Sequence, residues 1–113
     1  MHNLKLVLLI LLGLLLAGCG IEVPPAKSAY VGQWEADGMT LLITQDGSVS
    51  YKRFKKGAST KINAPLKAFH DDDFDVGIGP MTTTFKVSSP PREIDGSWKM
   101  TVDGVELTRV NRH

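Results

Sequence analysis

The sequence predicts a small all-β domain, a β-barrel-like or strongly curved antiparallel sheet, which follows an N-terminal signal helix. Beyond residue 30, apolar and polar residues alternate in short runs that are separated by glycine, proline and aspartate. A period of two is typical of antiparallel strands that bury one face. Two Asp-Gly dipeptides, Asp46-Gly47 and Asp103-Gly104, stand between such runs, as hairpin turns do. No segment beyond residue 30 keeps a helical period over enough residues for a long helix.

The first hairpin is predicted in residues 39–54, around Asp46-Gly47. A three-residue loop with Gly47 as a left-handed bulge residue pairs Ile43 with Val49 and keeps the apolar residues on one face. A two-residue loop at the same place would mix the two faces, because a shift of one residue turns every side chain over. The bulged loop is therefore the predicted register.

The second hairpin is predicted in residues 97–110, around Asp103-Gly104. Here a two-residue primed turn keeps the apolar residues on one face and the polar residues on the other. The pairs that this register predicts are Val102 with Val105, Met100 with Leu107, and Trp98 with Arg109.

The segments between the two hairpins are less regular. Residues 59–63 and 73–78 are predicted to be strands on either side of a loop, and residues 82–88 form a further predicted strand. The alternative for the first of these regions is one helical turn capped by Asn63. Residues 88–92, SSPPR, are predicted to be a rigid connection between strands.

The N-terminal residues have the pattern of a secretory signal. Lys5 and the terminal amine precede an apolar stretch from Leu6 to Leu16 that is interrupted by one glycine. This stretch is shorter than the roughly 20 residues of a membrane-spanning helix. A positive start, a short apolar core and small residues at its end predict a signal peptide at residues 1–18.

The residues that end this stretch resemble a bacterial lipobox; they are Leu16-Ala17-Gly18-Cys19. The resemblance implies cleavage before Cys19, a diacylglyceryl group on its thiol and a third acyl chain on its new amine. Several acyl chains together hold a protein firmly on a bilayer. The alternative is a cysteine buried in a hydrophobic N-terminal helix.

Gly20 follows this cysteine, as in lipoproteins that enteric bacteria send to the outer membrane. The resemblance therefore implies a protein that is lipid-anchored in the outer membrane and faces the periplasm. The inner membrane and the cell surface stay open as alternatives, because this sorting rule depends on the organism.

The mature chain would have 95 residues, with a lipidated tether at residues 19–29 and a β domain at residues 30–113. Pro24-Pro25 favours an extended path through the tether. Without Lys5, the mature chain has 12 basic and 12 acidic side chains, so it lacks the general positive charge of a nucleic-acid-binding protein. Once its one cysteine is acylated, no thiol is left for a disulfide or a nucleophile.

Two short motifs lie near the two ends of this β domain. Gly32-Gln33-Trp34 resembles the Gly-x-Trp at the start of lipocalin-like barrels, and Arg109 resembles the arginine that these barrels often place on the last strand. These matches imply a lipocalin-like β domain at residues 30–113. The resemblance implies a cation–π contact that closes the end of the barrel. Trp98, opposite Arg109 in the second hairpin, competes for the same partner. Gly32, both tryptophans and Arg109 are thus expected to be structural, and no ligand is implied.

Basic and aromatic residues interleave in residues 51–57, YKRFKKG. In the bacterial envelope, such a run fits lipid head groups, lipopolysaccharide phosphates or an acidic protein surface. The alternative is a charged edge strand that resists sheet-to-sheet aggregation. The candidate binding residues of this run are Lys52, Arg53, Lys55 and Lys56.

Residues 70–75, HDDDFD, are the most charged stretch. The alternating aspartates begin like a calcium-binding loop, but Val76 and Thr82 stand where that loop needs glycine and glutamate. No metal site is predicted, and a solvated acidic loop is the alternative to a binding surface. The candidate binding residues here are Asp71, Asp72 and Asp73.

Catalysis is not expected. A serine nucleophile needs a histidine base, and the mature chain keeps only His70 and His113, neither in a recognisable hydrolase motif. No catalytic residue and no cofactor are predicted. The sequence predicts a membrane-anchored envelope lipoprotein that acts as a non-catalytic binding or interaction module on a protein or lipid, not on nucleic acid. The alternatives are an inhibitor or immunity-type lipoprotein that blocks a toxin or envelope enzyme, and a carrier of a small apolar ligand within the barrel.

Overall fold

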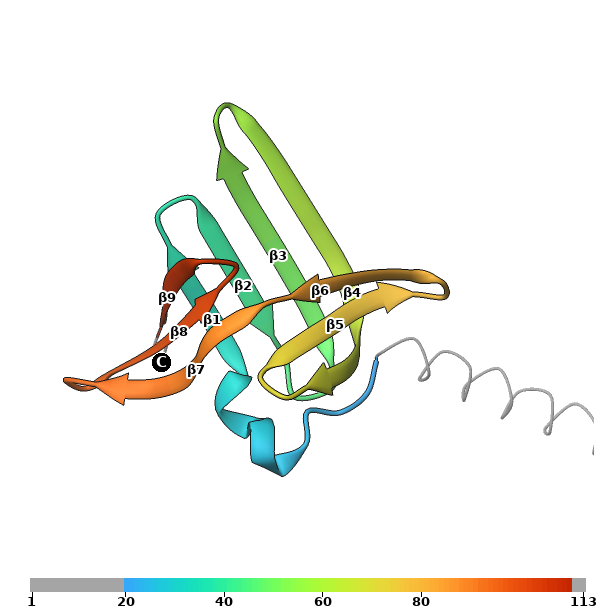
Figure 1. Cartoon of the computed structure of the whole chain (residues 1–113), viewed down its shortest axis with the longest axis horizontal. Coiled ribbons are helices and arrows are strands. Elements are labelled where there is room, and N and C mark those ends of the chain that lie inside the picture. The colour runs from blue at the N-terminus through green and yellow to red at the C-terminus, as the bar shows by residue number, and fades with distance from the viewer. Residues whose placement is uncertain (1–19, 111–113) are drawn as a thin grey trace, which may run out of the picture.

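The computed structural model describes residues 20–110 (Figure 1). In this part of the chain, a short 3-10 helix leads into strands that follow one another in sequence. The elements are η1 (Pro25–Tyr30), β1 (Gly32–Ala36), β2 (Met39–Ile43), β3 (Ser48–Lys55), β4 (Ala58–His70), β5 (Asp73–Ile78), β6 (Met81–Phe85), β7 (Val87–Ile94), β8 (Ser97–Val102) and β9 (Val105–Arg109).

The nine strands of residues 20–110 form one antiparallel sheet in the order β6-β5-β4-β3-β2-β1-β9-β8-β7. The sheet curls strongly into a half-barrel, in which β5 and β6 pass across the face of β3 and β4 (Figure 1). The first and last strands meet in the middle of the order, where Trp34 on β1 is opposite Arg109 on β9. The predicted all-β, strongly curved antiparallel sheet is confirmed.

The chain crosses directly from one edge of this sheet to the other at Lys86, the one residue between β6 and β7. Two aspartates hold the crossing. The Asp73 carboxylate accepts a hydrogen bond from the Val87 N–H at 2.7 Å, and the Asp103 carboxylate accepts one from the Lys86 N–H at 2.9 Å. The Asp103 N–H in turn donates to the Lys86 carbonyl at 2.7 Å. The prediction of one strand over residues 82–88 is therefore wrong, because these contacts end one strand and begin the next.

Both predicted hairpin registers are confirmed. In the first hairpin, Ile43 pairs with Val49, and Gly47 has a φ of +88°, which the bulged loop requires of it. In the second hairpin, Val102 pairs with Val105. The turn residues there, Asp103 and Gly104, have φ of +48° and +79°, as a primed two-residue turn requires.

The middle of the chain is extended, as predicted, and the alternative helical turn does not form. β4 pairs with β3 from Ala58 to Pro65, and it pairs with β5 only from Leu66 onward, after which the register shifts. Along Ala58–Ala64, therefore, β4 has a strand partner in the described sheet on the β3 side alone. The predicted rigid connection at residues 88–92 is wrong, since these residues belong to β7. Its prolines are tolerated because β7 is an edge strand with register shifts.

The interior of the half-barrel is filled by aromatic and aliphatic side chains. Phe85 packs against Phe74 with ring centroids 5.1 Å apart, and against Tyr51 with centroids 5.0 Å apart. Met100 and Leu41 are fully buried in the same cluster. These contacts join β2 and β3 to β5, β6 and β8, so the core is shared between the crossing parts of the sheet.

The prediction of a free tether over residues 19–29 is wrong for residues 20–29. The Ile21 N–H donates to the Leu66 carbonyl at 3.1 Å, and the Val23 N–H donates to the Gln45 carbonyl at 3.0 Å. Val23 is buried, and residues 25–30 form η1. Proline at the first turn of a helix is compatible with its φ, so Pro24-Pro25 does not keep the segment extended. Residues 20–29 are therefore part of the folded domain.

The start of this segment is packed too closely for side chains. A Cβ added to Gly20 would lie 2.6 Å from the Gly47 carbonyl oxygen and from the Leu66 backbone. A Cβ added to Gly47 would lie 1.9 Å from the Ile21 carbonyl oxygen. Gly20 thus has a packing role, which is independent of any sorting signal after the cysteine.

Candidate functional site

The predicted signal peptide, the lipobox and the lipidation residue Cys19 lie outside the described residues. Within residues 20–110, no helix is long and apolar enough to cross a bilayer. Cys19 is nevertheless one residue from Gly20, which is fixed against Gly47 and Leu66. An anchor on Cys19 would therefore hold this end of the sheet close to the membrane, without a long spacer.

The predicted structural residues come together at the pairing of β1 with β9. The Arg109 guanidinium carbon lies 5.9 Å from the Trp34 ring centroid and 5.0 Å from the Trp98 ring centroid, so it contacts both tryptophans. A Cβ at Gly32 would lie 2.8 Å from Arg109 Cδ. Gly32 thus leaves room for the arginine side chain that covers Trp34. The Trp34 indole N–H donates to the Tyr30 carbonyl at 2.9 Å, which ties η1 to this cluster.

The acidic stretch is a tight turn that η1 covers. The Lys27 ammonium donates to the Asp71 carbonyl, and the Tyr30 hydroxyl donates to the Asp72 carbonyl at 2.8 Å. Lys27 also lies 3.9 Å from the Asp72 carboxylate. Asp73 points inward to the β6–β7 crossing. The backbone of this turn is therefore already used in internal contacts.

The remaining acidic residue of this stretch is also engaged. The Asp75 carboxylate accepts a hydrogen bond from the Thr84 hydroxyl at 2.6 Å and lies 2.7 Å from His70 Nε2. The Thr84 hydrogen bond, with a further contribution from His70, holds the pKa of Asp75 below its usual range. In residues 20–110, no group of three or more His, Cys, Asp or Glu side chains is arranged to hold a metal ion.

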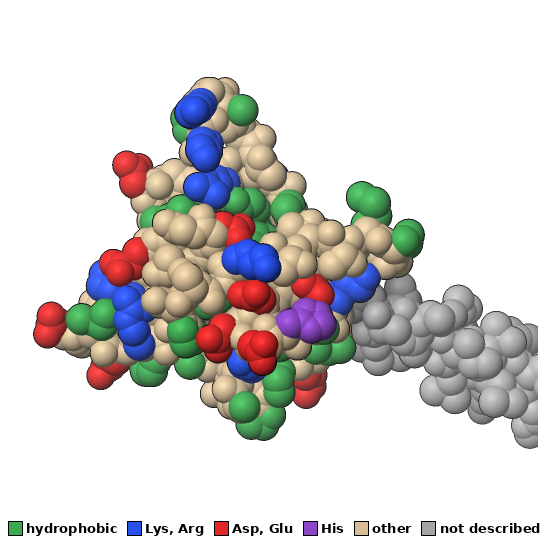
Figure 2. Space-filling model, in the orientation of Figure 1, with side chains coloured by type: hydrophobic (Ala, Val, Ile, Leu, Met, Phe, Trp, Pro, Cys, Tyr) green, Lys and Arg blue, Asp and Glu red, His purple; other side chains and the backbone are tan. Residues whose placement is uncertain are grey.

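The predicted basic residues lie along β3 and at the β3–β4 turn, but not on one face. Lys52 is on the outer face, whereas its neighbour Arg53 is paired with the buried Met39 on the inner side. Lys55 and Lys56 lie at the end of the hairpin, where Lys56 has a φ of +52°. Figure 2 shows Lys and Arg side chains that follow this hairpin to its end, whereas most of the Asp and Glu side chains in this view lie lower on the molecule.

Lys61 on β4 was not predicted and is directly opposite Lys52. Like charges at directly opposed strand positions destabilise a sheet. Neither ammonium has an ion-pair partner in the described part of the chain. The sequence does indicate that Lys61 belongs to the basic segment, because residues 47–70 contain six Lys and Arg side chains and no Asp or Glu.

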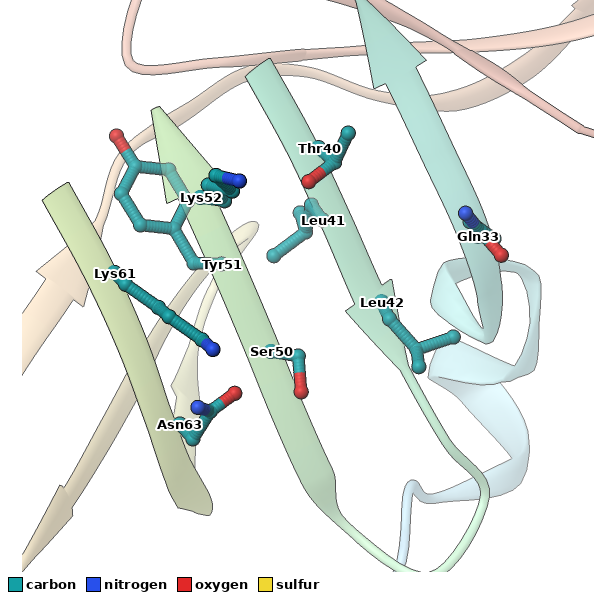
Figure 3. Close-up of a pocket in the computed structure, with 9 residues that line it drawn as sticks. All are labelled: Gln33, Thr40, Leu41, Leu42, Ser50, Tyr51, Lys52, Lys61 and Asn63. Carbon is teal, nitrogen blue, oxygen red and sulfur yellow. The ribbon is translucent and has the colours of Figure 1, made fainter. Parts of the chain in front are cut away.

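These two lysines line a shallow depression of about 370 Å³ on the outer face of β1–β4. Figure 3 shows Lys61 extended toward Ser50 and Asn63, while Lys52 lies near Thr40. The other lining residues include Gln33 and the partly exposed Leu42. Lysines, hydroxyls and amides are donors, so this face offers hydrogen bonds and positive charge to an anionic partner.

A second cleft, of about 630 Å³, lies between the free part of β4 and the β5–β6 hairpin. Its wall carries Ile78 and Met81, which are 68% and 74% exposed and are the two most exposed large hydrophobic side chains of residues 20–110. This apolar tip is not evident from the sequence, because glycine and proline at residues 77–80 are typical of a bend and do not show which side chains are exposed.

No family model, curated protein or solved structure matches this chain. The lipobox and lipocalin resemblances thus stay predictions that rest on the residues quoted for them. For the folded domain, the feature that indicates a function is the outer face of β3 and β4, with its opposed lysines Lys52 and Lys61.

Proposed function

We propose that this protein is a lipid-anchored envelope lipoprotein that acts as a non-catalytic interaction module and binds an acidic protein surface through the outer face of β3 and β4. Acylated Cys19 attaches it to the periplasmic side of the outer membrane. The observation that carries the proposed interaction is the Lys52–Lys61 pair, two opposed and unpaired ammonium groups in a stretch of 24 residues without an acidic side chain.

The direction of the basic hairpin favours a protein partner over the anchoring membrane. Residue 20 is fixed beside Gly47, at the start of β3. β3 has eight residues, which at about 3.3 Å each place Lys55 and Lys56 roughly 26 Å from that point. Figure 1 shows the β3–β4 hairpin projecting to the other end of the sheet from the segment at residues 20–24. The basic end would then be directed away from the lipids that hold Cys19.

The exposed aromatic ring of Phe54 adds to this surface. Phe54 is 61% exposed and lies two residues from Lys52, on the same face of β3. Aromatic side chains are enriched among the central residues of protein interfaces. This face therefore offers an acidic protein surface positive charge from its lysines and an apolar contact from Phe54.

The alternatives find less support. For an inhibitor that acts through the acidic stretch, the turn would have to be free, but Lys27 and Tyr30 bind its backbone and Asp73 holds the strand crossing. A carrier would need a dry internal cavity among residues such as Tyr51, Phe85 and Met100. These side chains instead pack against one another or are fully buried.

A photo-crosslinking experiment in cells tests the interaction. A photoreactive amino acid at Asn63, in the outer depression, is expected to give a discrete adduct with one envelope protein. Lys61→Glu is expected to reduce this adduct about tenfold, the equivalent of 1.4 kcal/mol in binding. Lys86→Glu is the control, because it also reverses one exposed lysine but lies at the β6–β7 crossing. Since Lys86 is 3.9 Å from the Asp73 carboxylate, circular dichroism must show that this variant is folded.

The same photoreactive amino acid at Glu93, on the distant edge strand β7, is expected to give no adduct of that mass. An adduct at Asn63 that Lys61→Glu and Lys86→Glu change equally would contradict the proposed basic interface.

A further inference from the structure

We propose that the tip of the β5–β6 hairpin is a second membrane contact, in which Ile78 and Met81 insert among the lipids next to the acylated cysteine. This inference rests on the proposed function, because it requires the anchor at Cys19. It assigns a role to the two most exposed of the large hydrophobic side chains in the described residues.

The tip lies close to the point where the chain would leave the membrane. Ile21 is hydrogen-bonded to Leu66, and Leu66 is also the partner of Val76 in the β4–β5 pairing. Ile78 is two residues farther along β5, about 7 Å from Val76. The tip and the anchor thus flank the same corner of the sheet, and the anchor is only two residues before Ile21.

The shape of the hairpin suits shallow insertion. Ile78 pairs with Met81 across a two-residue turn at Gly79-Pro80, so both apolar side chains stand at the end of one narrow projection. Figure 2 shows hydrophobic side chains at this projection, on the side of the molecule where the described chain begins. No backbone of the sheet interior has to be uncovered for these side chains to enter a lipid surface.

A lysine fixes the hairpin and is placed at the depth of lipid head groups. The Lys67 ammonium donates to the Gly79 carbonyl and to the Thr82 hydroxyl, each at 2.8 Å. It thereby satisfies a turn carbonyl that would otherwise approach the lipid, which matters because unpaired backbone groups are costly there. An ammonium beside the turn can also attract a phosphate head group, which suits a tip that enters the lipid only to a shallow depth.

The consequence is a fixed orientation on the bilayer. Ile21, which is 45% exposed, lies on the same corner and extends the apolar surface between anchor and hairpin. With two contacts at this corner, the domain cannot rotate freely about its acyl chains. The far end of the β3–β4 hairpin, at Lys55 and Lys56, is then held toward the periplasm, and Lys61 lies between that end and the tip, in the cleft that it lines together with Met81.

The test uses the full chain, purified from membranes and reconstituted into vesicles of phosphatidylethanolamine and phosphatidylglycerol. Because acylated Cys19 is not a free thiol, Met81→Cys introduces the one site for a polarity-sensitive fluorophore. Its emission is expected to shift to the blue and to be largely lost when lipids carry a quencher on their acyl chains. Phe54→Cys is the matched control, since Phe54 is similarly exposed but lies near the other end of β3. Its label is expected to be quenched by aqueous iodide alone.

Equal quenching of the two labels by iodide would overturn the membrane contact. A Met81→Cys label that is shielded from both iodide and the lipid-borne quencher would also overturn it, because a second protein copy would then cover the tip. The labelling reaction itself separates the two proposals: two reactive thiols per Met81→Cys chain would show that Cys19 is not acylated, and the proposed function would then fail together with this inference.

Discussion

Trp34→Ala is expected to lower the free energy of unfolding by about 3–5 kcal/mol, the range for removing a large aromatic side chain from a packed core. Trp34 is completely buried and donates its indole N–H to the Tyr30 carbonyl. It also lies under the Arg109 guanidinium, at the pairing of the first and last strands. Its removal therefore weakens η1, β1 and β9 together. Denaturant unfolding followed by circular dichroism measures the change.

Two further variants keep this prediction testable if Trp34→Ala does not fold. Trp98→Ala is expected to cost about 1–2 kcal/mol, because Trp98 is only half-buried. Arg109→Ala is expected to cost about 1 kcal/mol through the cation–π contacts it makes with both rings. Arg109 contacts both rings, so the two tryptophan variants show which contact matters more. If Trp98→Ala lowers the free energy of unfolding more than Trp34→Ala does, the arginine stabilises mainly the second hairpin and not the β1–β9 pairing.

Stability is expected to fall between pH 10 and pH 12 because of Tyr30. Burial, with the nearby Asp72 and Asp73 carboxylates, raises the pKa of Tyr30 from 10.0 to about 12. Below pH 10 the folded and unfolded chains both keep the phenolic proton, so the contribution is fully present. Between the two pKa values only the unfolded chain loses the proton, and this favours unfolding by up to about 2.7 kcal/mol.

Tyr30→Phe is the comparison that isolates this effect. At pH 9 the variant is expected to be about 1 kcal/mol less stable, since it lacks the hydrogen bond to the Asp72 carbonyl. As the pH rises toward 12, its stability is expected to fall less than that of the natural chain, so that the order reverses. Parallel stability curves for the two proteins would show that Tyr30 does not dock η1 on the acidic turn as described.

The parts of the fold that depend on neighbouring residues could be predicted from the sequence. Each hairpin is set by the alternation of its two strands and by the turn between them, and Gly47 and Gly104 mark those turns. The arginine that contacts both tryptophans was also expected, from the second hairpin register together with the Gly-x-Trp resemblance. The hairpins need no contacts between distant parts of the chain, whereas the Arg109–Trp34 contact joins the first and last strands and was expected only from the resemblance.

The parts that were missed depend on distant residues. The break at Lys86 cannot be seen in the local pattern, because Thr82–Phe85 and Val87 are all good strand formers. It arises from carboxylates at Asp73 and Asp103, one on each side in the sequence. The docking of residues 20–29 likewise depends on bonds to Gln45 and Leu66.

The basic site was predicted only in part for the same reason. The run from Lys52 to Lys56 is visible in the sequence, but alternation along a strand sends its members to different faces. Lys61 joins Lys52 only through the β3–β4 pairing. The acidic run was predicted as a candidate binding surface because its charge is evident in the sequence. Its internal partners, Lys27 and Tyr30, are not evident there, because they lie more than 40 residues away.

The intact mass of the protein extracted from bacterial membranes tests the lipid anchor most directly. The expected mass is that of a chain beginning at Cys19, with a diacylglyceryl group on sulfur and an acyl chain on the new amine. Cys19→Ala is expected to leave the full-length precursor without these groups. A natural chain that keeps residues 1–18 and carries an unmodified Cys19 thiol would contradict the anchored interaction module proposed for this protein.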